Sequence, residues 1–361
     1  MSAILSIRGL TTEFPTRHGM VRAVDGVDLD IQAGECLGVV GESGSGKSVT
    51  FMSVVGLVRP PGRVVEGAVL FDGTDLRSLP AGGMRAIRGR DIAITMQDAL
   101  TALNPAFTVG TQIVEALRAH DRAFAGPAGY RRARERAVEM LRLTGVPDPA
   151  RRIEAYPHQL SGGMRQRAMI ATALACRPRL LIADEPTTAL DVTIQAQVLD
   201  LIQEMRTTLG MSVVLITHDL GIVAERCARV AVMYAGQVVE TGPTADVIAR
   251  PAHPYTRGLL ASMPRLSHLH EPLTPIAGQV PDPTRLPDPA GRLQGEIPSP
   301  VTPPSGCRFR TRCPLAQARC AEEEPQMRKV EGDHYVACHF PLVDVPGGAD
   351  AGEAVPAGAT A

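Results

Sequence analysis

One string of residues constrains this chain of 361 residues more than any other: GESGSGKS, from Gly41 to Ser48. Four free positions separate its first glycine from Gly-Lys-Ser, which is the spacing of a phosphate-binding loop. The apolar run 36–40 before it predicts a buried strand, and the residues from Ser48 onward predict a helix. Glycines at such a junction let backbone N–H groups curl around phosphate oxygens at a helix N-terminus. The string therefore predicts a nucleotide-phosphate site formed by Gly41, Glu42, Ser43, Gly44, Ser45, Gly46, Lys47 and Ser48.

Lysine is rare in this chain: among 37 basic residues, only Lys47 and Lys329 are lysines. The chain uses arginine for almost all of its other positive charges. A lysine at position 47 therefore suggests that a compact ammonium group is needed there, between phosphates. Lys47 is expected to reach the β- and γ-phosphates, and Ser48 is expected to hold Mg²⁺. A glycine-rich turn without a ligand is the alternative, and the strand and helix on either side favour the nucleotide site.

Composition narrows the class of protein. The hydrophobic content of 44% supports a folded core, and no apolar run approaches the about 20 residues that span a bilayer. The N-terminus lacks a basic and then apolar leader, so we expect a cytosolic chain. The net charge of −1 and the aromatic content of 3% argue against nucleic acid as a partner.

Short apolar strands alternate with helical patterns, which predicts an α/β fold around a mostly parallel sheet. Strands are expected at 92–96, 180–183 and 213–217, and Asp72-Gly73 predicts a hairpin turn between earlier antiparallel strands. We expect a nucleotide-binding domain over 1–250, with a helical subdomain at about 99–160. Eleven prolines in the 41 residues from Pro264 to Pro304 predict an extended arm within an extension at 251–345. The Gly/Ala/Pro-rich tail 346–361 is expected to be disordered.

A pair of carboxylates ends one of the predicted strands. The apolar run 180–183 leads directly into Asp184 and Glu185. Groups that follow parallel strands collect at one edge of the sheet. Asp184 is therefore predicted to hold Mg²⁺, directly or through water, and Glu185 to polarise the attacking water as a general base. An acidic strand end that faces solvent is the alternative.

The string LSGGMRQR, from Leu160 to Arg167, resembles the signature motif of ABC-type ATPases. A serine hydroxyl and two glycine N–H groups open a helix here, so that donors and the helix dipole can face phosphate. The resemblance implies an ABC-type ATPase domain with a mixed sheet core, an antiparallel β part and a helical subdomain, followed by a Pro-rich, Cys-containing extension. It also implies that the nucleotide is contacted by Ser161, Gly162, Gly163 and Gln166.

Other motifs follow in the order typical of this family. Gln97 resembles the Q-loop glutamine that touches Mg²⁺ or the attacking water, and Asp191 resembles the D-loop aspartate. His218 resembles the switch histidine that contacts the γ-phosphate. Phe14 lies where the family places an aromatic ring that stacks on adenine, and a core phenylalanine is the alternative.

Residues 97–105, 156–161 and 253–260 resemble the ATP-binding subunits of bacterial dipeptide/oligopeptide importers, a family that also includes nickel importers. The resemblance implies ATP-driven peptide import, with nickel or another solute as the alternative and a soluble ABC ATPase without a transport role as a more remote one. The implied partners are a second ABC ATPase subunit (a heterodimer as first choice, a homodimer as the alternative), two membrane permease subunits and, indirectly, a substrate-binding protein. The implied location is peripheral, at the cytoplasmic face of the inner membrane.

Four cysteines crowd together near the C-terminus, separated by gaps of five, six and seventeen residues: Cys307, Cys313, Cys320 and Cys338. The paired CxxC spacing of a zinc ribbon is missing. Four thiolates can ligate a [4Fe–4S] cluster, and the family resemblance implies one. Zinc and the absence of any metal are the alternatives. The nearby Arg308, Arg310 and Arg312 are expected either to stabilise an anionic cluster or to be solvated.

Overall fold

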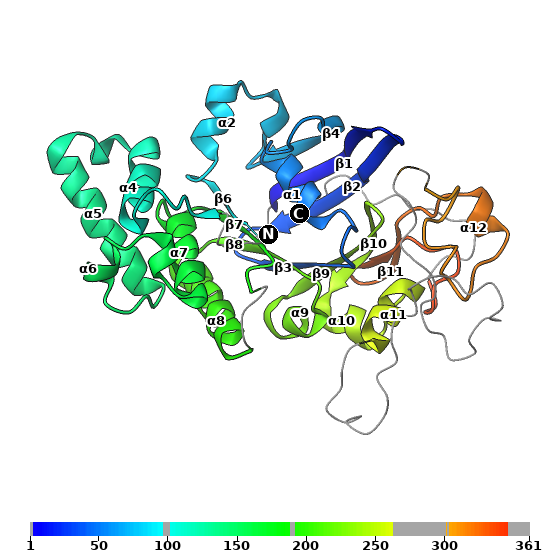
Figure 1. The fold of residues 1–361 in the computed structure, drawn as a ribbon. Coiled ribbons are helices and arrows are strands. Elements are labelled where there is room, and N and C mark those ends of the chain that lie inside the picture. Colours follow the sequence, from blue (N-terminus) through cyan, green and yellow to red (C-terminus); the bar gives the residue numbers. More distant parts are fainter. Residues whose placement is uncertain (1–2, 97–101, 188–191, 263–300, 302, 346–361) are drawn as a thin grey trace.

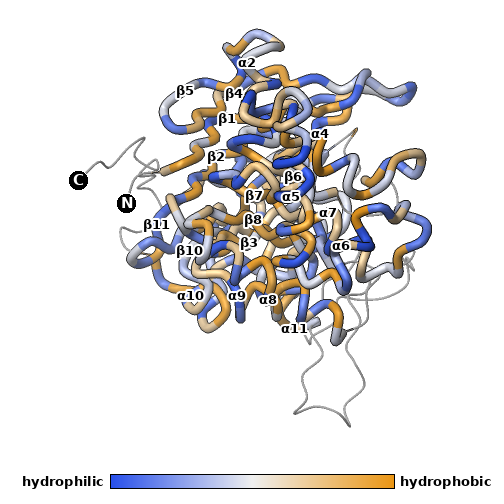
Figure 2. The backbone as a smooth tube through the Cα atoms, turned by 90° about the vertical axis from the view of Figure 1, so that its left-hand side faces the viewer, coloured by the Kyte–Doolittle hydropathy of each residue, from blue (hydrophilic) through white to orange (hydrophobic). Residues whose placement is uncertain are grey.

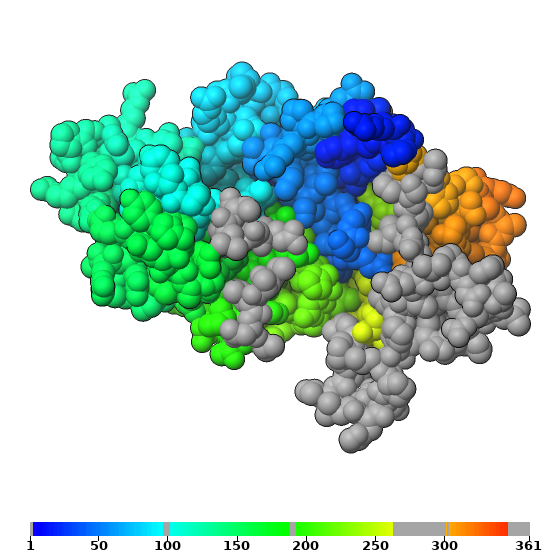
Figure 3. Space-filling model, viewed as in Figure 1, coloured from blue at the N-terminus to red at the C-terminus, as the bar shows by residue number. Residues whose placement is uncertain are grey.

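The computed structural model describes residues 3–96, 102–187, 192–262, 301 and 303–345 (Figure 1). In this part of the chain a large sheet runs through the centre, with a smaller antiparallel sheet above it and helices on its other face. The helical part and the cysteine segment lie at opposite ends of the molecule (Figure 3). Gln97 and Asp191, for which roles in the nucleotide site are predicted, lie outside the described residues, as do most of the proline-rich arm and the tail.

The large sheet has eight strands in the described ranges, in the spatial order β11-β12-β10-β9-β3-β8-β7-β6. The five strands from β9 to β6 are parallel to their neighbours, and β10 returns antiparallel to β9. The predicted strands before the phosphate-binding loop and before the carboxylate pair are confirmed as central strands of this sheet. The bounds are β3 Cys36–Val40, β6 Ile92–Thr95, β7 Leu180–Asp184, β8 Ser212–Thr217, β9 Arg229–Tyr234, β10 Gln237–Pro243, β11 Arg328–Glu331 and β12 His334–Val336.

The smaller sheet is antiparallel, in the order β2-β1-β4-β5. Its strands are β1 Ala3–Thr16, β2 Gly19–Gln32, β4 Arg63–Phe71 and β5 Thr74–Asp75. Asp72 and Gly73 join the last two strands, with φ of 50° and 78°. Two successive left-handed residues are the signature of a type I′ turn, so the predicted hairpin is confirmed.

Alternate residues of the central strands belong to two different hydrophobic cores. Leu180 and Ile182 pack into the core between the two sheets, together with Phe51 of helix α1, Lys47–Val54. Leu181 and Ala183 pack into the core on the opposite, helix-covered face. Because strand side chains alternate with a period of two, a strand that is buried on both faces must be apolar throughout. Figure 2 shows this concentration of hydrophobic residues along β3, β7 and β8.

Helices occupy the described part of the region predicted as a helical subdomain. Its main helices are α4, Val109–His120, and α5, Gly126–Leu143, and the apolar face expected at Ile113, Val114 and Leu117 is buried. The other helices and 3₁₀ turns of the described chain are α2 Ala81–Ile87, α6 Pro149–Arg152, α7 Gly162–Leu174, α8 Val192–Leu209, α9 Leu220–Arg226, α10 Thr244–Ala249, α11 Pro254–Ala261, α12 Arg319–Glu322, η1 Leu76–Ser78, η2 Arg122–Phe124 and η3 Pro157–Gln159. None of the helices in these ranges has the length and apolar character needed to span a membrane.

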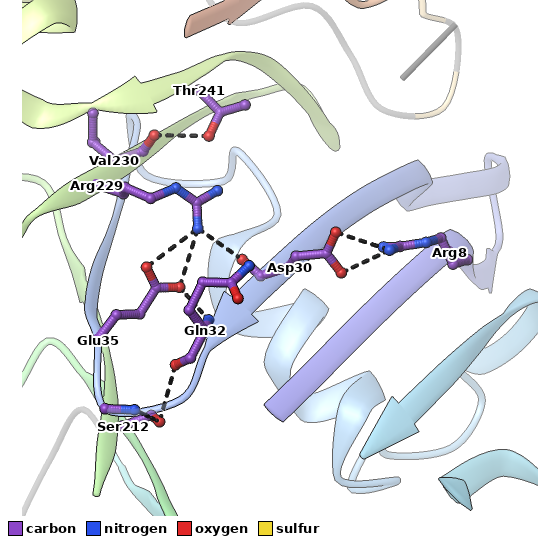
Figure 4. Close-up of polar contacts among 9 residues, drawn as sticks. Arg8, Asp30, Gln32, Glu35, Ser212, Arg229, Val230 and Thr241 are labelled. Atoms are coloured by element: carbon purple, nitrogen blue, oxygen red, sulfur yellow. Dashed lines mark hydrogen bonds and ion pairs between the residues drawn. The ribbon is translucent and has the colours of Figure 1, made fainter. Parts of the chain in front are cut away.

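A polar junction joins the two sheets where β2 turns into β3 (Figure 4). The Arg229 guanidinium donates to both carboxylate oxygens of Glu35, at 3.1 and 3.2 Å, and to the carbonyl of Asp30 at 3.2 Å. The Ser212 hydroxyl donates to the carbonyl of Gln32 at 3.1 Å. These bonds fix the start of β3, and hence the strand that presents the phosphate-binding loop.

The C-terminal extension adds strands to the large sheet. The hairpin β11–β12 pairs with β10, with Glu240 opposite Val336 and Thr241 opposite Tyr335. A small apolar cluster of Ala252, Val330 and Val336 lies beneath it. The extension and the nucleotide-binding part are therefore hydrogen-bonded through one continuous sheet.

Candidate functional site

The phosphate-binding loop leaves β3 and enters α1 through a turn that requires glycine. Gly41 and Gly46 have φ of 152° and 99°, in the region that favours glycine. A Cβ on Gly41 would collide with the carbonyl oxygen of Met233, and a Cβ on Gly46 would collide with that of Ala23. The loop is thus pressed against two neighbouring backbones, which leaves no room for a side chain at Gly41 or Gly46.

Lys47 occupies the centre of this loop. Its ammonium donates to the carbonyl of Gly41 at 2.7 Å and to that of Glu42 at 2.9 Å. Burial lowers the pKa of Lys47, and the nearby carboxylates of Glu185, Asp184 and Glu42 act in the opposite direction. A buried cation held by neutral carbonyls is ready to exchange them for phosphate oxygens, because an anion offsets its desolvation far better.

Ser48 and Asp184 come together from α1 and the end of β7. The Ser48 hydroxyl donates to Asp184 Oδ1 at 2.9 Å. The pKa of Asp184 is raised, mainly because its carboxyl group is buried. The Ser48 hydroxyl and Lys47 lower this pKa, and the neighbouring Glu185 raises it further. Adjacent oxygen ligands of an octahedral Mg²⁺ at 2.0–2.1 Å stand about 2.9 Å apart. The spacing of this hydroxyl and carboxylate therefore fits a magnesium site.

Glu185 and His218 face each other at the same edge of the sheet. Glu185 has a left-handed backbone, with φ of 44°, and its N–H donates to the carbonyl of Ile216 at 2.9 Å. Its carboxylate lies 3.5 Å from His218 Nδ1, and the His218 side chain is 68% exposed. Strained backbone at a non-glycine residue is typical of functional positions. The arrangement places the Glu185 carboxylate close enough to Lys47 to affect its pKa, and an exposed imidazole beside that carboxylate.

The signature string forms the start of α7. Ser161 is the N-cap, and its hydroxyl accepts a hydrogen bond from the Met164 N–H at 3.3 Å. Ser161 and Gly162 are exposed and Gly163 is half-buried. Because Ser161 and Gly162 are exposed, another molecule can reach this helix start. Gln166 is buried, and its amide donates to the carbonyl of Pro186, next to Glu185; its contact with nucleotide stays a prediction.

Phe14 lies on β1, opposite Val21, and is half-buried. Its ring covers Gly62, because a Cβ on that glycine would overlap the ring. Stacking of this ring on adenine stays a prediction.

The four cysteines line a single pocket, together with His253, Phe309 and Phe340. Burial raises the pKa of Cys307, raises that of Cys313 to about 11 and raises that of Cys338 to about 12. In the described ranges, however, no three His, Cys, Asp or Glu side chains are placed so that they can hold a metal ion. The four thiols therefore share one pocket, and the metal that they would hold stays a prediction.

Two of the nearby arginines are paired with the nucleotide-binding part. Arg308 pairs with Asp25 and the carbonyl of Ala235, and Arg312 pairs with Glu42. Solvation is therefore wrong for these two side chains, because each is buried against a carboxylate, and a role at a cluster stays a prediction. The sequence offers no local signal for these pairs, since the partners stand 283 and 270 positions apart.

A loop that cradles phosphate, a hydroxyl–carboxylate pair spaced for Mg²⁺ and a strained glutamate at the end of a parallel strand define a P-loop nucleotide hydrolase. Residues 24–188 match the family model described as ABC transporter, and residues 239–320 match the one described as oligopeptide/dipeptide transporter, C-terminal region.

The similar proteins agree with both matches. A dipeptide transport ATP-binding protein (DppD) of Haemophilus influenzae is 46% identical over 94% of this chain and 96% of its own length. An oligopeptide transport ATP-binding protein (OppD) of Bacillus subtilis is 45% identical over 96% of this chain and 91% of its own. The solved dimeric ATP-binding cassette MJ0796, bound to ADP and Pi, has a TM-score of 0.60 at 28% identity and covers 66% of this chain and 98% of that one.

The chain belongs to the ABC transporter family, among the ATP-binding subunits of the oligopeptide/dipeptide type, and it hydrolyses ATP to drive transport.

Proposed function

We propose that this chain powers the import of dipeptides or oligopeptides, working at the cytoplasmic face of the inner membrane with a second ATPase subunit, two permease subunits and, indirectly, a substrate-binding protein. The observation that carries the proposal is the joining of an ABC transporter domain to the C-terminal region of oligopeptide/dipeptide transporters in one chain. Import of nickel or another solute by a transporter of the same type is the second candidate, because the cargo is bound by other chains.

We infer a separate role for each residue of the ATP site. Lys47 and the N–H groups of the phosphate-binding loop bind the β- and γ-phosphates, and Ser48, Asp184 and Gln97 are the residues that hold Mg²⁺. Magnesium, when bound, neutralises charge on the phosphates. Glu185 accepts a proton from the attacking water as the water oxygen bonds to the γ-phosphorus, and the bond to the bridging oxygen breaks to give ADP and phosphate. His218 lies close enough to Glu185 to contact the same γ-phosphate.

The exposed start of α7 supports a two-domain arrangement. Ser161 and Gly162 are exposed at the start of this helix, and a helix N-terminus attracts an anion. We propose that they contact the γ-phosphate held by a partner domain, with Asp191 near the interface. A heterodimer with a related subunit is our first choice, and the dimeric cassette MJ0796 supports pairing of such domains in general.

We further propose that Cys307, Cys313, Cys320 and Cys338 hold a [4Fe–4S] cluster, with zinc as the alternative. Metal binding would displace the protons that the buried thiols retain at neutral pH. Chain purified without oxygen should contain about four irons. Stoichiometric zinc without iron would overturn the assignment to a cluster.

Glu185→Gln tests the mechanism. We expect ATP hydrolysis by the assembled transporter to fall by roughly 10²–10⁴-fold, the usual contribution of a general base. ATP binding should persist, because Lys47 and the loop are unchanged. Glu331→Gln, at an exposed glutamate in β11, is the control and should keep full turnover. Turnover near that of the control would show that Glu185 is not the base.

Uptake by cells tests the cargo. Cells that lack this chain, and cells that carry only the Glu185→Gln form, should both lose uptake of a labelled dipeptide or a labelled longer peptide. Loss of nickel uptake alone would replace the peptide proposal by the second candidate.

A further inference from the structure

Glu42, the second residue of the phosphate-binding loop, is held at each of its polar groups. Its N–H donates to the hydroxyl of Tyr255 at 2.9 Å. Its carbonyl accepts from the Lys47 ammonium at 2.9 Å and from the Ser45 N–H at 3.2 Å. Its carboxylate accepts two bonds from the Arg312 guanidinium, at 2.6 and 2.9 Å. The conformation of this residue is therefore determined from three sides.

Two of these anchors come from outside the part that matches the ABC transporter model. That match ends at residue 188, whereas Tyr255 and Arg312 fall within 239–320, the range that matches the oligopeptide/dipeptide C-terminal region. The C-terminal region thus reaches the nucleotide site directly, by two side chains that end on one residue of the loop.

Arg312 is buried in a way that commits it to this contact. Its side chain is only 3% exposed, and its guanidinium also donates to the Tyr234 hydroxyl at 3.3 Å and lies 5.7 Å from the centre of the Tyr234 ring. Burying a guanidinium is unfavourable unless a carboxylate compensates for the lost water. The two parallel bonds to Glu42 provide that compensation and fix the orientation of both groups.

The Tyr255 ring packs with the rings of Tyr234 and Phe309 in a buried aromatic cluster. The Tyr255 ring centre lies 4.6 Å from that of Tyr234 and 5.5 Å from that of Phe309. These three rings come from β9, α11 and the segment between Cys307 and Cys313, and all are fully buried. The cluster leaves the Tyr255 hydroxyl little freedom, so it holds the Glu42 N–H in one direction.

We propose that Arg312 and Tyr255 are positioning residues for ATP binding, which act through Glu42 to preorganise the phosphate-binding loop. This proposal rests on the function proposed above for that loop. A loop that is already ordered does not have to be ordered by the ligand, and the saved free energy appears as affinity. Both anchors contact the loop at Glu42, so the effect should fall on binding rather than on turnover.

The test compares variants of the full-length chain. For Arg312→Gln we expect the Kd for ATP to rise roughly tenfold, which is about 1.4 kcal/mol. In the assembled transporter the KM for ATP should rise likewise, while kcat at saturating ATP stays within about twofold. Tyr255→Phe removes one hydrogen-bond acceptor and keeps the ring, so the Kd for ATP should rise by a smaller factor. This variant tests the proposal if the arginine variant folds poorly.

A double-mutant cycle checks the route through Glu42. If Arg312 acts through this carboxylate, Glu42→Gln combined with Arg312→Gln should bind ATP no more weakly than the weaker single variant. Arg250→Gln is the matched control. Arg250 likewise forms an arginine–glutamate pair between the nucleotide-binding part and the extension, with Glu331 at 2.8 Å, but this pair is exposed and away from the loop. The control variant should bind ATP as the unmodified chain does.

Two results would overturn the proposal: an unchanged Kd in both Arg312→Gln and Tyr255→Phe, or a fall in thermal stability and kcat with no rise in KM. Lys47→Ala separates this failure from a failure of the underlying function. If Lys47→Ala abolishes ATP binding and the two positioning variants do not weaken it, only the positioning role is wrong. If Lys47→Ala binds ATP normally, the assignment of the phosphate-binding loop itself is wrong.

Discussion

Replacing Glu240 should destabilise the junction between the sheet and the C-terminal extension. The Glu240 side chain is fully buried on β10, where its carboxylate accepts from the N–H of Ala252 at 2.6 Å, the N–H of His253 at 3.0 Å and the imidazole Nε2 of His334 at 2.7 Å. Glu240→Ala leaves two backbone donors and one ring nitrogen buried without a partner. Each orphaned donor costs about 1–3 kcal/mol, and removing one member of a buried pair costs about 3–5 kcal/mol in all.

We therefore expect the free energy of unfolding to fall by about 4 kcal/mol in Glu240→Ala, with a drop in Tm of roughly 5–6 °C for a chain of this size. Glu240→Gln keeps one acceptor oxygen and should lose about half as much. The assay is urea and thermal unfolding of the full chain without nucleotide. Glu331→Gln is the control, because its ion pair with Arg250 is exposed on both sides and is worth about 0–1 kcal/mol. A Glu240→Ala chain as stable as this control would refute the reasoning that the carboxylate holds the extension in place.

Three further changes test other parts of the structure. Gly46→Ala should lower the Tm of the nucleotide-free chain more than Gly44→Ala, because both add left-handed strain of about 1–2 kcal/mol but only the first collides with the carbonyl of Ala23; equal Tm values would contradict this. Phe309→Ala should cost about 3–5 kcal/mol in urea unfolding, because it empties the centre of the aromatic cluster; a loss below 1 kcal/mol would mean that the site collapses. Burial raises the pKa of Cys176 to about 11, so its alkylation at pH 8, followed by mass spectrometry, should be roughly a hundredfold slower than in the urea-unfolded chain and should accelerate up to pH 10; equal rates would contradict the pKa.

The elements that carry the chemistry could be predicted because their signals are local. The strands that end at Val40, Asp184 and Thr217 are buried on both faces, so each reads as an unbroken apolar run. The helices of the 99–160 region show their periodic apolar faces in the same direct way. Glycine positions follow from the turn that the phosphate-binding loop must make.

The contacts of the C-terminal extension could not be predicted, because their causes are distant. Arg312 and Glu42 are 270 positions apart in the chain. The residues around each of them give no sign that its side chain is buried and paired. The hairpin β11–β12 is short and largely polar, RKVE and HYV, so it has no alternation strong enough to predict a strand. It forms because β10 presents an unpaired edge, which is a property of the assembled sheet.

The edge of β10 that pairs with β12 is completed late in the synthesis of the chain. β10 ends at Pro243 and its outer neighbour β12 begins at His334, so the edge that they share stays open while about 90 further residues are made. At about 5–20 residues per second, a ribosome exposes this strand edge for roughly 5–20 s in every copy of the protein. An open edge is a template for pairing with another chain, so these seconds are the period in which a nascent copy is most prone to join its neighbour. A copy whose synthesis stops before His334 keeps that edge open permanently.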